Sequence, residues 1–331
     1  MVKTSTMRGC AIALAACATA AQGCKPNIDE TTSLVTTPRI LAVRSEPAEA
    51  PPDTPVTLSA LYVDASGSIA NAPIDWAFCD DRKPPAELGP VSPRCLQRDG
   101  DWFEPLGLGP RATGPLPKLA CRNFGPEVPP VIDKEPAGRP VDPDPTGGFY
   151  QPIRVEVASA SGEEKAIGRT RITCGVVGPS SDQLAEMKQR NHTNANPAID
   201  SLHEATLGDL APDDASPAHP NAVTAGQRLA LRGVWATCAE GAPSCTGAES
   251  YASFDVSAQA IVGRREAIRV SWFATGGAFE HDHTGRSEAE GDPFTENVWT
   301  APAQGGTAHL WLVVRDDRGG VGWRAYTFEA R

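Results

Sequence analysis

The residues whose types could do chemistry gather in one short segment, Glu280-His281-Asp282-His283. His281 and His283 are two positions apart, so in an extended segment their side chains point to the same side. Two imidazoles with the carboxylate of Asp282 are donors that Zn²⁺ and similar metals accept. Nothing nearby fixes a further ligand. We therefore expect a solvated loop between strands, with a metal site at these three residues as the alternative.

A pair of acidic residues, Asp316 and Asp317, precedes Arg318-Gly319-Gly320. Oxygen ligands from such a pair could bind calcium. The same residues also build turns, because aspartate bonds to its own backbone and glycine accepts a positive φ. We prefer the turn.

Hydrolytic chemistry finds little support in the sequence. It contains no G-x-S-x-G nucleophile motif. His203-Glu204 lacks the second histidine of a zinc-protease helix. A glycosidase pair of carboxylates stays open, although no two acids stand out. We expect a protein without catalytic residues or cofactor.

Six cysteines remain once the N-terminal Cys10, Cys17 and Cys24 are set aside: Cys79, Cys95, Cys121, Cys174, Cys238 and Cys245. An even number in an exported chain indicates disulfides, and no C-x-x-C spacing favours zinc. Cys238 and Cys245 flank a short loop and are the pair that we expect first. The other four allow three connectivities. We favour Cys79 with Cys95, on proximity in the sequence, and the remaining two with each other.

The N-terminal segment has the pattern of an export signal. Lys3 and Arg8 are followed by the uncharged run Gly9–Ala21, whose 13 residues fall short of the roughly 20 that span a bilayer. The run leads into Ala21-Gln22-Gly23-Cys24, after which the chain turns polar. We expect residues 1–23 to be a signal peptide and residues 24–37 a flexible tether.

Ala21-Gln22-Gly23-Cys24 resembles the lipobox of bacterial lipoproteins, in which the cysteine is diacylated and becomes the first residue. The resemblance implies a palmitate-bearing lipid anchor on Cys24. Leu14–Cys17 follows Arg8 too closely to compete, while Ala18-Thr19-Ala20 stays open as an ordinary cleavage site. Lys25 stands where an aspartate would retain some lipoproteins at the inner membrane, so we expect the outer membrane.

The net charge of the chain limits the classes of partner that it can bind. The full sequence has 30 basic and 41 acidic residues, a net charge of −11. Removal of residues 1–23 takes away two basic residues and no acidic one. Nucleic acids and anionic lipid surfaces attract clustered Lys and Arg, so we expect no nucleic acid partner and attachment to the membrane through lipid.

The elements that carry these residues are predicted to be strands. Gly and Pro are each 31 residues, and helical periodicity is almost absent. In a first domain, residues 38–178, apolar and polar residues alternate from Val56 to Tyr62 and from Ile74 to Phe78. Residues 80–149 hold 15 of the prolines, which leaves room for short strands only, such as Trp102–Leu106 and Leu119–Cys121.

A second domain, residues 196–331, repeats this plan. Ile268, Val270 and Trp272 alternate with polar residues as Ile74–Phe78 do. Between the domains, residues 179–195 contain the one helix candidate, Ser181–Arg190, which Ser181 could cap. The fold class that we predict is all-β: two antiparallel β-sandwiches in tandem with a short connecting helix.

The second domain resembles bacterial immunoglobulin-like and polycystic-kidney-disease-type domains. Leu310–Gly320 and Trp272 carry the resemblance. The whole chain, with PRILAVRSEPAEA at 38–50 and DPTGGFYQPIRV at 144–155, is also similar to myxobacterial-type lipoproteins. Both resemblances imply immunoglobulin-like sandwiches at a cell surface, and neither implies a reaction.

Two functions follow as expectations. The first is a non-enzymatic envelope protein with a structural or protein-binding role. The second is carbohydrate binding through Trp311 or the loop at 276–297. Trp311 has the opposite parity to Leu310 and Leu312, so either this strand is buried on both faces or Trp311 is exposed and can stack on a sugar. We prefer burial against the neighbouring domain.

Overall fold

The computed structural model describes residues 32–82, 91–97, 100–126, 145–159, 162–215 and 219–331. Ser33–Arg331 form one compact unit. The predicted signal peptide and Cys24 lie outside the described residues. Among the residues that are described, no helix is long and apolar enough to cross a membrane.

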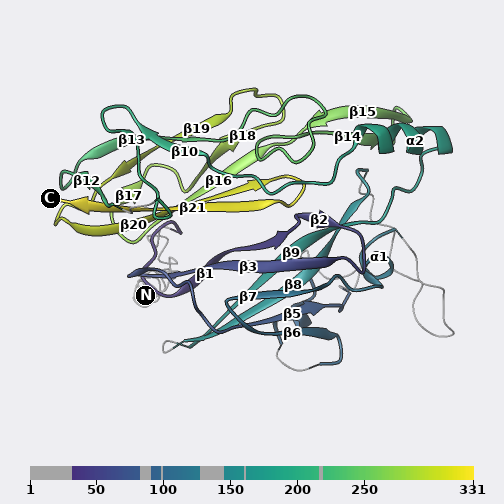
Figure 1. Ribbon diagram of the computed structural model, residues 1–331, viewed down its shortest axis with the longest axis horizontal. Helices are drawn as coiled ribbons and strands as arrows, with labels where there is room; N and C mark the ends of the chain where they lie inside the picture. The colour runs from purple at the N-terminus through teal and green to yellow at the C-terminus, as the bar shows by residue number, and fades with distance from the viewer. Residues whose placement is uncertain (1–31, 83–90, 98–99, 127–144, 160–161, 216–218) are drawn as a thin grey trace, which may run out of the picture. The chain divides into compact units, whose positions relative to one another are not determined.

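The N-terminal sandwich consists of two sheets built from strands β1–β9 (Figure 1). The smaller sheet contains β1 (Arg39–Glu46), β3 (Pro55–Asp64), β4 (Gly67–Ser68) and β7 (Arg111–Pro115). The larger has the order β2 (Glu49–Ala50), β9 (Gly162–Thr173), β8 (Gly148–Ser159), β5 (Ile74–Cys79) and β6 (Phe103–Gly109). Alternating apolar residues of both sheets meet between them, with Trp76, Phe78 and Leu58 fully buried.

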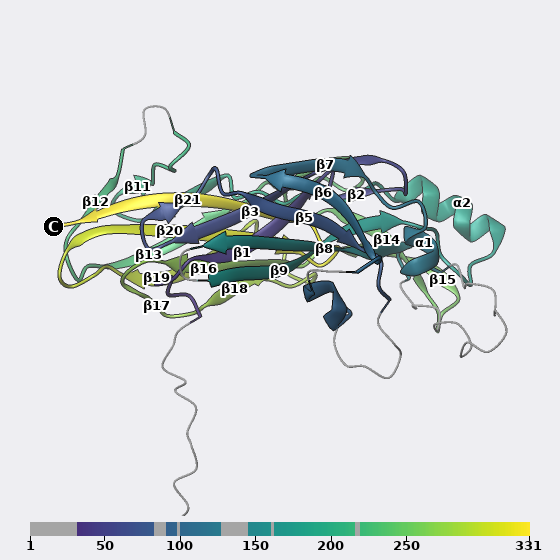
Figure 2. The same cartoon turned by 90° about the horizontal axis from the view of Figure 1, so that it is seen from below.

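The C-terminal sandwich is built in the same way from two five-stranded sheets (Figure 2). One has the order β11 (Gly208–Asp209), β10 (Ser201–Glu204), β13 (Arg228–Val234), β19 (Phe294–Thr300) and β17 (Ala278–Phe279). The other has the order β12 (Asn221–Val223), β21 (Val321–Ala330), β20 (Gly306–Asp316), β16 (Ile268–Ala274) and β18 (His283–Arg286). A separate hairpin joins β14 (Ser250–Asp255) and β15 (Ala260–Arg265).

The two sandwiches share one topology. In each, the first strand pairs antiparallel in one sheet, and a short strand then crosses to pair parallel with the last strand of the other: β2 with β9, and β12 with β21. The strand with the central tryptophan, β5 or β16, pairs with the first strand of the closing hairpin. This arrangement confirms the predicted all-β fold with two immunoglobulin-like sandwiches.

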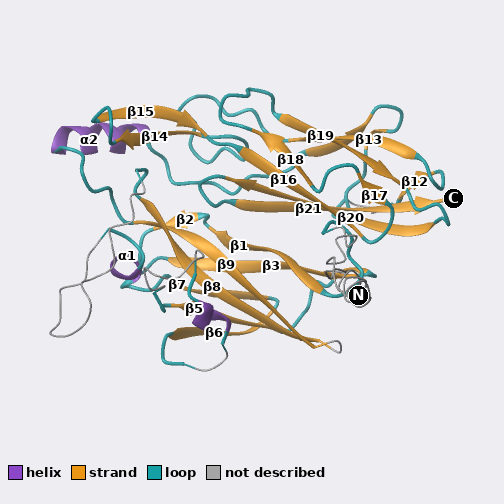
Figure 3. Cartoon of the chain, turned by 180° about the vertical axis from the view of Figure 1, so that it is seen from behind, coloured by secondary structure: helices purple, strands orange, loops and turns teal. Residues whose placement is uncertain are grey.

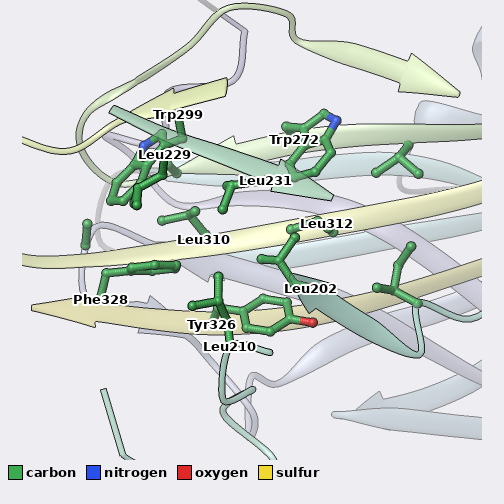
Figure 4. Packing of buried hydrophobic residues seen from close by; sticks show 14 of the residues in the cluster. Leu202, Leu210, Leu229, Leu231, Trp272, Trp299, Leu310, Leu312, Tyr326 and Phe328 are labelled. Atoms are coloured by element: carbon green, nitrogen blue, oxygen red, sulfur yellow. The ribbon is translucent and has the colours of Figure 1, made fainter. Parts of the chain in front are cut away.

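The core of the C-terminal sandwich is rich in aromatic rings (Figure 4). Trp272 and Trp299 are fully buried, and the Trp299 and Phe328 ring centroids lie 5.0 Å apart at a tilt of 54°. Each indole finds a hydrogen-bond acceptor: Trp272 Nε1 donates to Thr284 Oγ1 over 2.8 Å and Trp299 Nε1 to the Gly276 carbonyl over 3.1 Å. Burial of each large ring contributes stability of the order of 3 kcal/mol.

Two predicted elements need correction (Figure 3). Leu119–Cys121 is not a strand, because α1 (Ala120–Asn123) forms there after Pro117; η1 (Pro93–Leu96) is the other short helix of this region. Helix α2 has the predicted bounds Ser181–Arg190, but its cap is Ser180, which forms a capping box with Gln183.

Helix α2 packs on the C-terminal sandwich instead of bridging freely between domains. Met187 is buried with Ala252 and Phe254 of the β14–β15 hairpin. Leu184, expected on the same face, is 40% exposed. The helix therefore belongs to the hairpin.

The predicted tether, residues 24–37, extends too far. Ser33 and Val35 bond to the backbone of Ala274, with Val35 N–H donating over 2.8 Å and Ala274 N–H donating to Ser33 over 2.9 Å. The Val35 side chain is fully buried. The chain is thus part of the fold from Ser33 onward, because Leu34 and Val35 have an apolar surface to cover.

Candidate functional site

Three disulfides form, in the pairing that we favoured. They join Cys79 to Cys95, Cys121 to Cys174 and Cys238 to Cys245, with Cα–Cα distances of 5.7, 5.4 and 5.7 Å. The first two fasten η1 and α1, on the proline-rich part of the chain, to the larger N-terminal sheet. All six cysteines that the structure describes are therefore used in cross-links.

The histidines of the candidate metal site do not converge. The His281 backbone N–H donates to Asn297 Oδ1 over 3.2 Å, and this residue lines a groove of about 450 Å³ over β10, β13 and β19. His283 Nδ1 lies 3.0 Å from Ser271 Oγ and lines a different recess, of about 530 Å³, over β16 and β18. Asp282 stands between them in the chain, and among the described residues no three His, Cys, Asp or Glu side chains are grouped to bind a metal.

The acidic pair near the C-terminus builds a turn. Gly319 has φ of +98°, as the predicted turn requires. Asp316 accepts hydrogen bonds from the Gly320 N–H over 2.7 Å and from Asn194 Nδ2 over 3.2 Å. A Cβ on Gly320 would lie 2.1 Å from Asp316 Oδ2, so this position requires glycine. Asp316 therefore closes the turn and also contacts the segment that links the sandwiches.

Trp311 is not available for stacking on a ligand. Its side chain is 1% exposed, and its Nε1 donates to Ser68 Oγ over 2.8 Å. The strand β20 is thus buried on both faces, which is the alternative that we preferred. The large apolar side chains that are exposed in the described part of the chain are all aliphatic: Leu96, Leu108, Leu119, Val177, Leu184, Leu207 and Val256.

Trp311 belongs to an apolar contact between the two sandwiches, which we call the junction. Its buried apolar residues are Val35, Leu41, Ala42, Leu61 and Val63 of the N-terminal part and Trp311, Val313 and Val321 of the C-terminal sandwich. At its margin the Arg44 guanidinium lies 4.7 Å from the centre of the Trp323 ring. Each sandwich thus buries an outer sheet face on the other.

Asparagine side chains attach the linker between the sandwiches to both of them. Asn196 Nδ2 donates to the Ser45 carbonyl of β1 over 2.7 Å, and its Oδ1 accepts from the Val321 N–H of β21 over 2.9 Å. The Asn194 backbone N–H donates to Glu49 Oε2 over 3.0 Å, while its side chain bonds to Asp316. Two residues of the linker therefore bridge the sandwiches directly.

A cluster of buried charges continues this attachment. Arg318, 5% exposed, forms ion pairs with Glu249 over 2.8 Å and Glu266 over 2.6 Å. Its Nη1 also donates to the carbonyl of His192 in the linker over 3.2 Å, and Glu249 accepts from the Ala195 N–H over 3.0 Å. The cluster connects the linker with the β14–β15 hairpin and the final turn.

Burial changes the protonation of this cluster. Burial raises the pKa of Asp316 to about 6, and it also raises the pKa of Glu249 and Glu266, the latter with help from the charge on Asp316. Burial alone would lower the pKa of Arg318, but the carboxylates of Glu266 and Glu249 raise it. The arginine thus stays charged while its acidic neighbours hold protons more tightly than usual.

Sequence reasoning missed the junction asparagines. Asn191, Asn194 and Asn196 stand close together before Pro197, a composition typical of turns and caps. Asn191 also bonds to the backbone of Ala252. Their closeness in the sequence was the signal that could have pointed to them, although no neighbouring residue identifies the groups to which they bond.

A recess of about 850 Å³ lies over α2 and the β14–β15 hairpin. Two of its charged residues, Arg264 and Glu288, form an ion pair over 3.2 Å, and Arg190 pairs with Glu186 of α2 over 2.9 Å. Tyr251 lines it as well, with the Arg318 guanidinium 5.1 Å from its ring centre. The recess shows no preference for one sign of charge.

No protein-family model matches the sequence, and no curated protein matches it either. Solved structures that are similar include the D00-D0 domain of intimin, at 7% identity over 88% of this chain and 98% of that one, with a TM-score of 0.20. The fibronectin(III)-like modules of CbhA from Clostridium thermocellum match at 10% identity over 88% and 94%, with a TM-score of 0.21. Latent PorU from Porphyromonas gingivalis matches at 9% identity and a TM-score of 0.21, and the match spans 90% of this chain but 24% of PorU. At these scores the assignment of the fold rests on the strand order above.

Proposed function

We propose that this chain is a non-enzymatic protein of the bacterial cell envelope that is anchored by lipid on Cys24. In this proposal its two sandwiches act as one rigid unit, which holds a protein-binding surface at a fixed orientation. The observation that carries the proposal is the junction. Separate domains on a flexible linker move relative to one another by default, whereas here the linker is bonded to both sandwiches.

The chemistry of the junction supports rigidity. An apolar contact alone lets two surfaces slide, because it is not directional. The Asn196 and Asn194 hydrogen bonds and the Trp311 Nε1–Ser68 Oγ bond fix the register of that contact. Each bond between buried groups adds about 1 kcal/mol and is costly to leave unmade.

The disulfides and the N-terminal pattern support export. Three disulfides form and persist in oxidising compartments such as the periplasm and the cell surface. A single acyl chain binds a membrane only marginally, so the two or more chains of a lipoprotein explain stable attachment. We propose the outer membrane as the site.

Carbohydrate binding through Trp311, one form of the second expectation, is not retained. It required an exposed aromatic platform, and Trp311 is buried at the junction.

The anchor is tested by labelling cells with a palmitate analogue. We expect label on the wild-type protein and none after Cys24→Ala, with the variant released from the membrane fraction. Label that persists in this variant, or a processed chain that begins at another residue, would contradict the anchor.

The rigid presentation is tested by crosslinking in intact cells followed by mass spectrometry. We expect one envelope protein to recur with the wild type, and its yield to fall with Asn196→Ala, which loosens the junction. Asn71→Ala is the matched control, because Asn71 is exposed and distant in sequence from the linker. Equal yields from all three proteins would refute a role for junction rigidity.

A further inference from the structure

Two arginines lie directly opposite each other on the C-terminal sandwich. Arg269 of β16 and Arg315 of β20 are cross-strand partners in the register of their sheet. Like charges at such positions destabilise an antiparallel pair. The position opposite Arg269 on the other side is Gly285 of β18, where a Cβ would lie 2.1 Å from the Ile268 carbonyl oxygen. The three facing positions on β18, β16 and β20 therefore contain two cations and no side chain that could neutralise them.

A third arginine comes from the N-terminal sandwich. Arg169 of β9 and Arg315 line a recess of about 240 Å³ at the junction, and Arg315 and Arg269 line the adjoining recess of about 530 Å³. Burial, and then the charges of Arg169 and Arg269, lower the pKa of Arg315. Arg315 is thus close enough to both of the other arginines to be repelled by each.

None of these three arginines forms an ion pair with a residue that the structure describes. Arg315 Nη2 donates to the Leu41 carbonyl over 3.0 Å, and the Arg169 guanidinium lies 5.1 Å from the centre of the Tyr150 ring. The ion pairs found among the described residues are formed by basic residues other than Arg169, Arg269 and Arg315.

Two acidic residues, Asp316 and Asp317, also line the recess of Arg269, and their carboxylates interact with groups other than these three arginines. Asp316 accepts from Asn194 and Gly320, and burial raises its pKa. Asp317 interacts with the Ala267 backbone and the charge of Arg318. The chain as a whole has 41 acidic against 30 basic residues, so an uncompensated cluster of cations is a local exception.

Ser271 and His283 lie beside these arginines. Ser271 Oγ lies 3.0 Å from His283 Nδ1 and 3.5 Å from Arg315 Nη1, so one hydroxyl connects the histidine with the arginine. His283 lines the same recess as Arg269. Arginine, histidine and hydroxyl groups together are the donors that proteins use for oxyanions.

We propose that Arg169, Arg269, Arg315 and His283 form a binding site for a phosphate group. Guanidinium forks match the geometry of phosphate oxygens, and several cations around one recess favour a group with more than one negative charge. A bound phosphate would remove the repulsion between Arg269 and Arg315. Because Arg169 and Arg315 come from different sandwiches, a bound phosphate would also stabilise the contact between the two sandwiches. The site does not depend on the lipid anchor.

The test measures thermal unfolding and calorimetric binding of the purified full-length chain with inorganic phosphate and with glycerol 3-phosphate, against sodium chloride at equal ionic strength. We expect both phosphates to raise Tm, and Arg269→Gln to weaken binding about tenfold, since it removes one charge-assisted contact. Binding of both compounds means that the phosphate group itself is recognised. Binding of glycerol 3-phosphate alone identifies an esterified source such as a headgroup.

Arg269→Gln is chosen because the exposed Arg269 makes no hydrogen bond or ion pair with a described residue, so its loss should not disturb folding. Arg111→Gln is the matched control: Arg111 is also an exposed strand arginine with another arginine, Arg44, nearby. The control should bind like the wild type. A Tm rise no larger than with chloride, or equal weakening by both variants, would overturn the site.

Discussion

The two sandwiches have the same strand order but are stabilised differently. The N-terminal sandwich is cross-linked by two disulfides, one of which spans 53 residues of sequence, whereas the single disulfide of the C-terminal sandwich spans 7. The C-terminal core contains three tryptophans, Trp235, Trp272 and Trp299, whereas Trp76 is the one tryptophan of the N-terminal core cluster, whose other buried aromatic residues are Tyr62, Phe78 and Phe149. One topology thus tolerates two solutions: disulfides on the proline-rich part of the chain in the N-terminal sandwich, and a core with more tryptophan in the C-terminal sandwich.

The largest expected change in stability comes from removal of the Cys121–Cys174 disulfide. Cys121→Ala with Cys174→Ala should lower the free energy of unfolding by about 4 kcal/mol, because the reduced chain regains the entropy of a long loop. Removal of the Cys238–Cys245 disulfide should cost about 2.5 kcal/mol by the same relation. Denaturant titration of both variants checks the order. A reversed order would mean that loop entropy does not explain how the N-terminal sandwich is stabilised.

The next prediction concerns the pH dependence of the free energy of unfolding, which we expect to arise in the C-terminal sandwich. Burial raises the pKa of Asp316 to about 6, so the folded chain binds a proton there that the unfolded chain has released. This contribution is present below about pH 4 and is lost as pH rises through about 6, so the free energy of unfolding should fall over that window by about 1–3 kcal/mol. Glu249 and Glu266 act in the same direction, since their pKa values are raised too.

Asp316→Asn should flatten this dependence in part, whereas the exposed Asp213 offers a matched control as Asp213→Asn. Chemical denaturation at several pH values measures both. Stability of the wild type that rises with pH through this window would contradict the assignment.

A smaller effect is expected at the bridge between the sandwiches. Asn196→Ala removes bonds to Ser45 and Val321 and should cost about 1–2 kcal/mol. Hydrogen exchange of residues 191–197 should accelerate, while amides in the β5–β8 pair should exchange as before. Acceleration in both sandwiches alike would show that they unfold as one and that the bridge has no local role.

The smallest effect has the opposite sign. Arg269→Glu replaces a like-charged cross-strand pair by an opposite one beside Arg315, so it should stabilise the phosphate-free protein by about 0.2–1 kcal/mol. Arg111→Glu is the control for the change in net charge. Destabilisation by Arg269→Glu in phosphate-free buffer would show that Arg269 is neutralised by a partner already.

The strands with regular alternation could be predicted because their signal is local. Val56–Tyr62 lies within β3 and Ile268–Trp272 within β16, since a period of two follows from the pleat itself. The parity of Trp311 allowed either burial on both faces or exposure, and the preferred burial is the one that the structure shows. Spacing in the sequence favoured the Cys238–Cys245 and Cys79–Cys95 disulfides, and Cys121–Cys174 was the pair that remained.

The remaining features depend on partners far along the chain. Nothing near Asn196 shows that it will bond to Ser45, 151 residues away, or near Asn194 that it will meet Asp316. The turn of helix at Cys121 replaced an expected strand because prolines and a disulfide outweigh β propensity. For His281 and His283, proximity in sequence was misleading, since they line different recesses.

The apolar face at the junction has a consequence for how the protein is made. A chain is synthesised from its N-terminus, so its N-terminal domain is complete first. Leu41, Leu61 and Val63 would then be exposed to water until Val313 and Val321, on the last two strands, arrive to cover them. Until then the incomplete chain exposes an apolar sheet face, so we expect it to need a chaperone that prevents aggregation. We also expect a chain truncated before residue 306 to aggregate instead of forming a stable single sandwich.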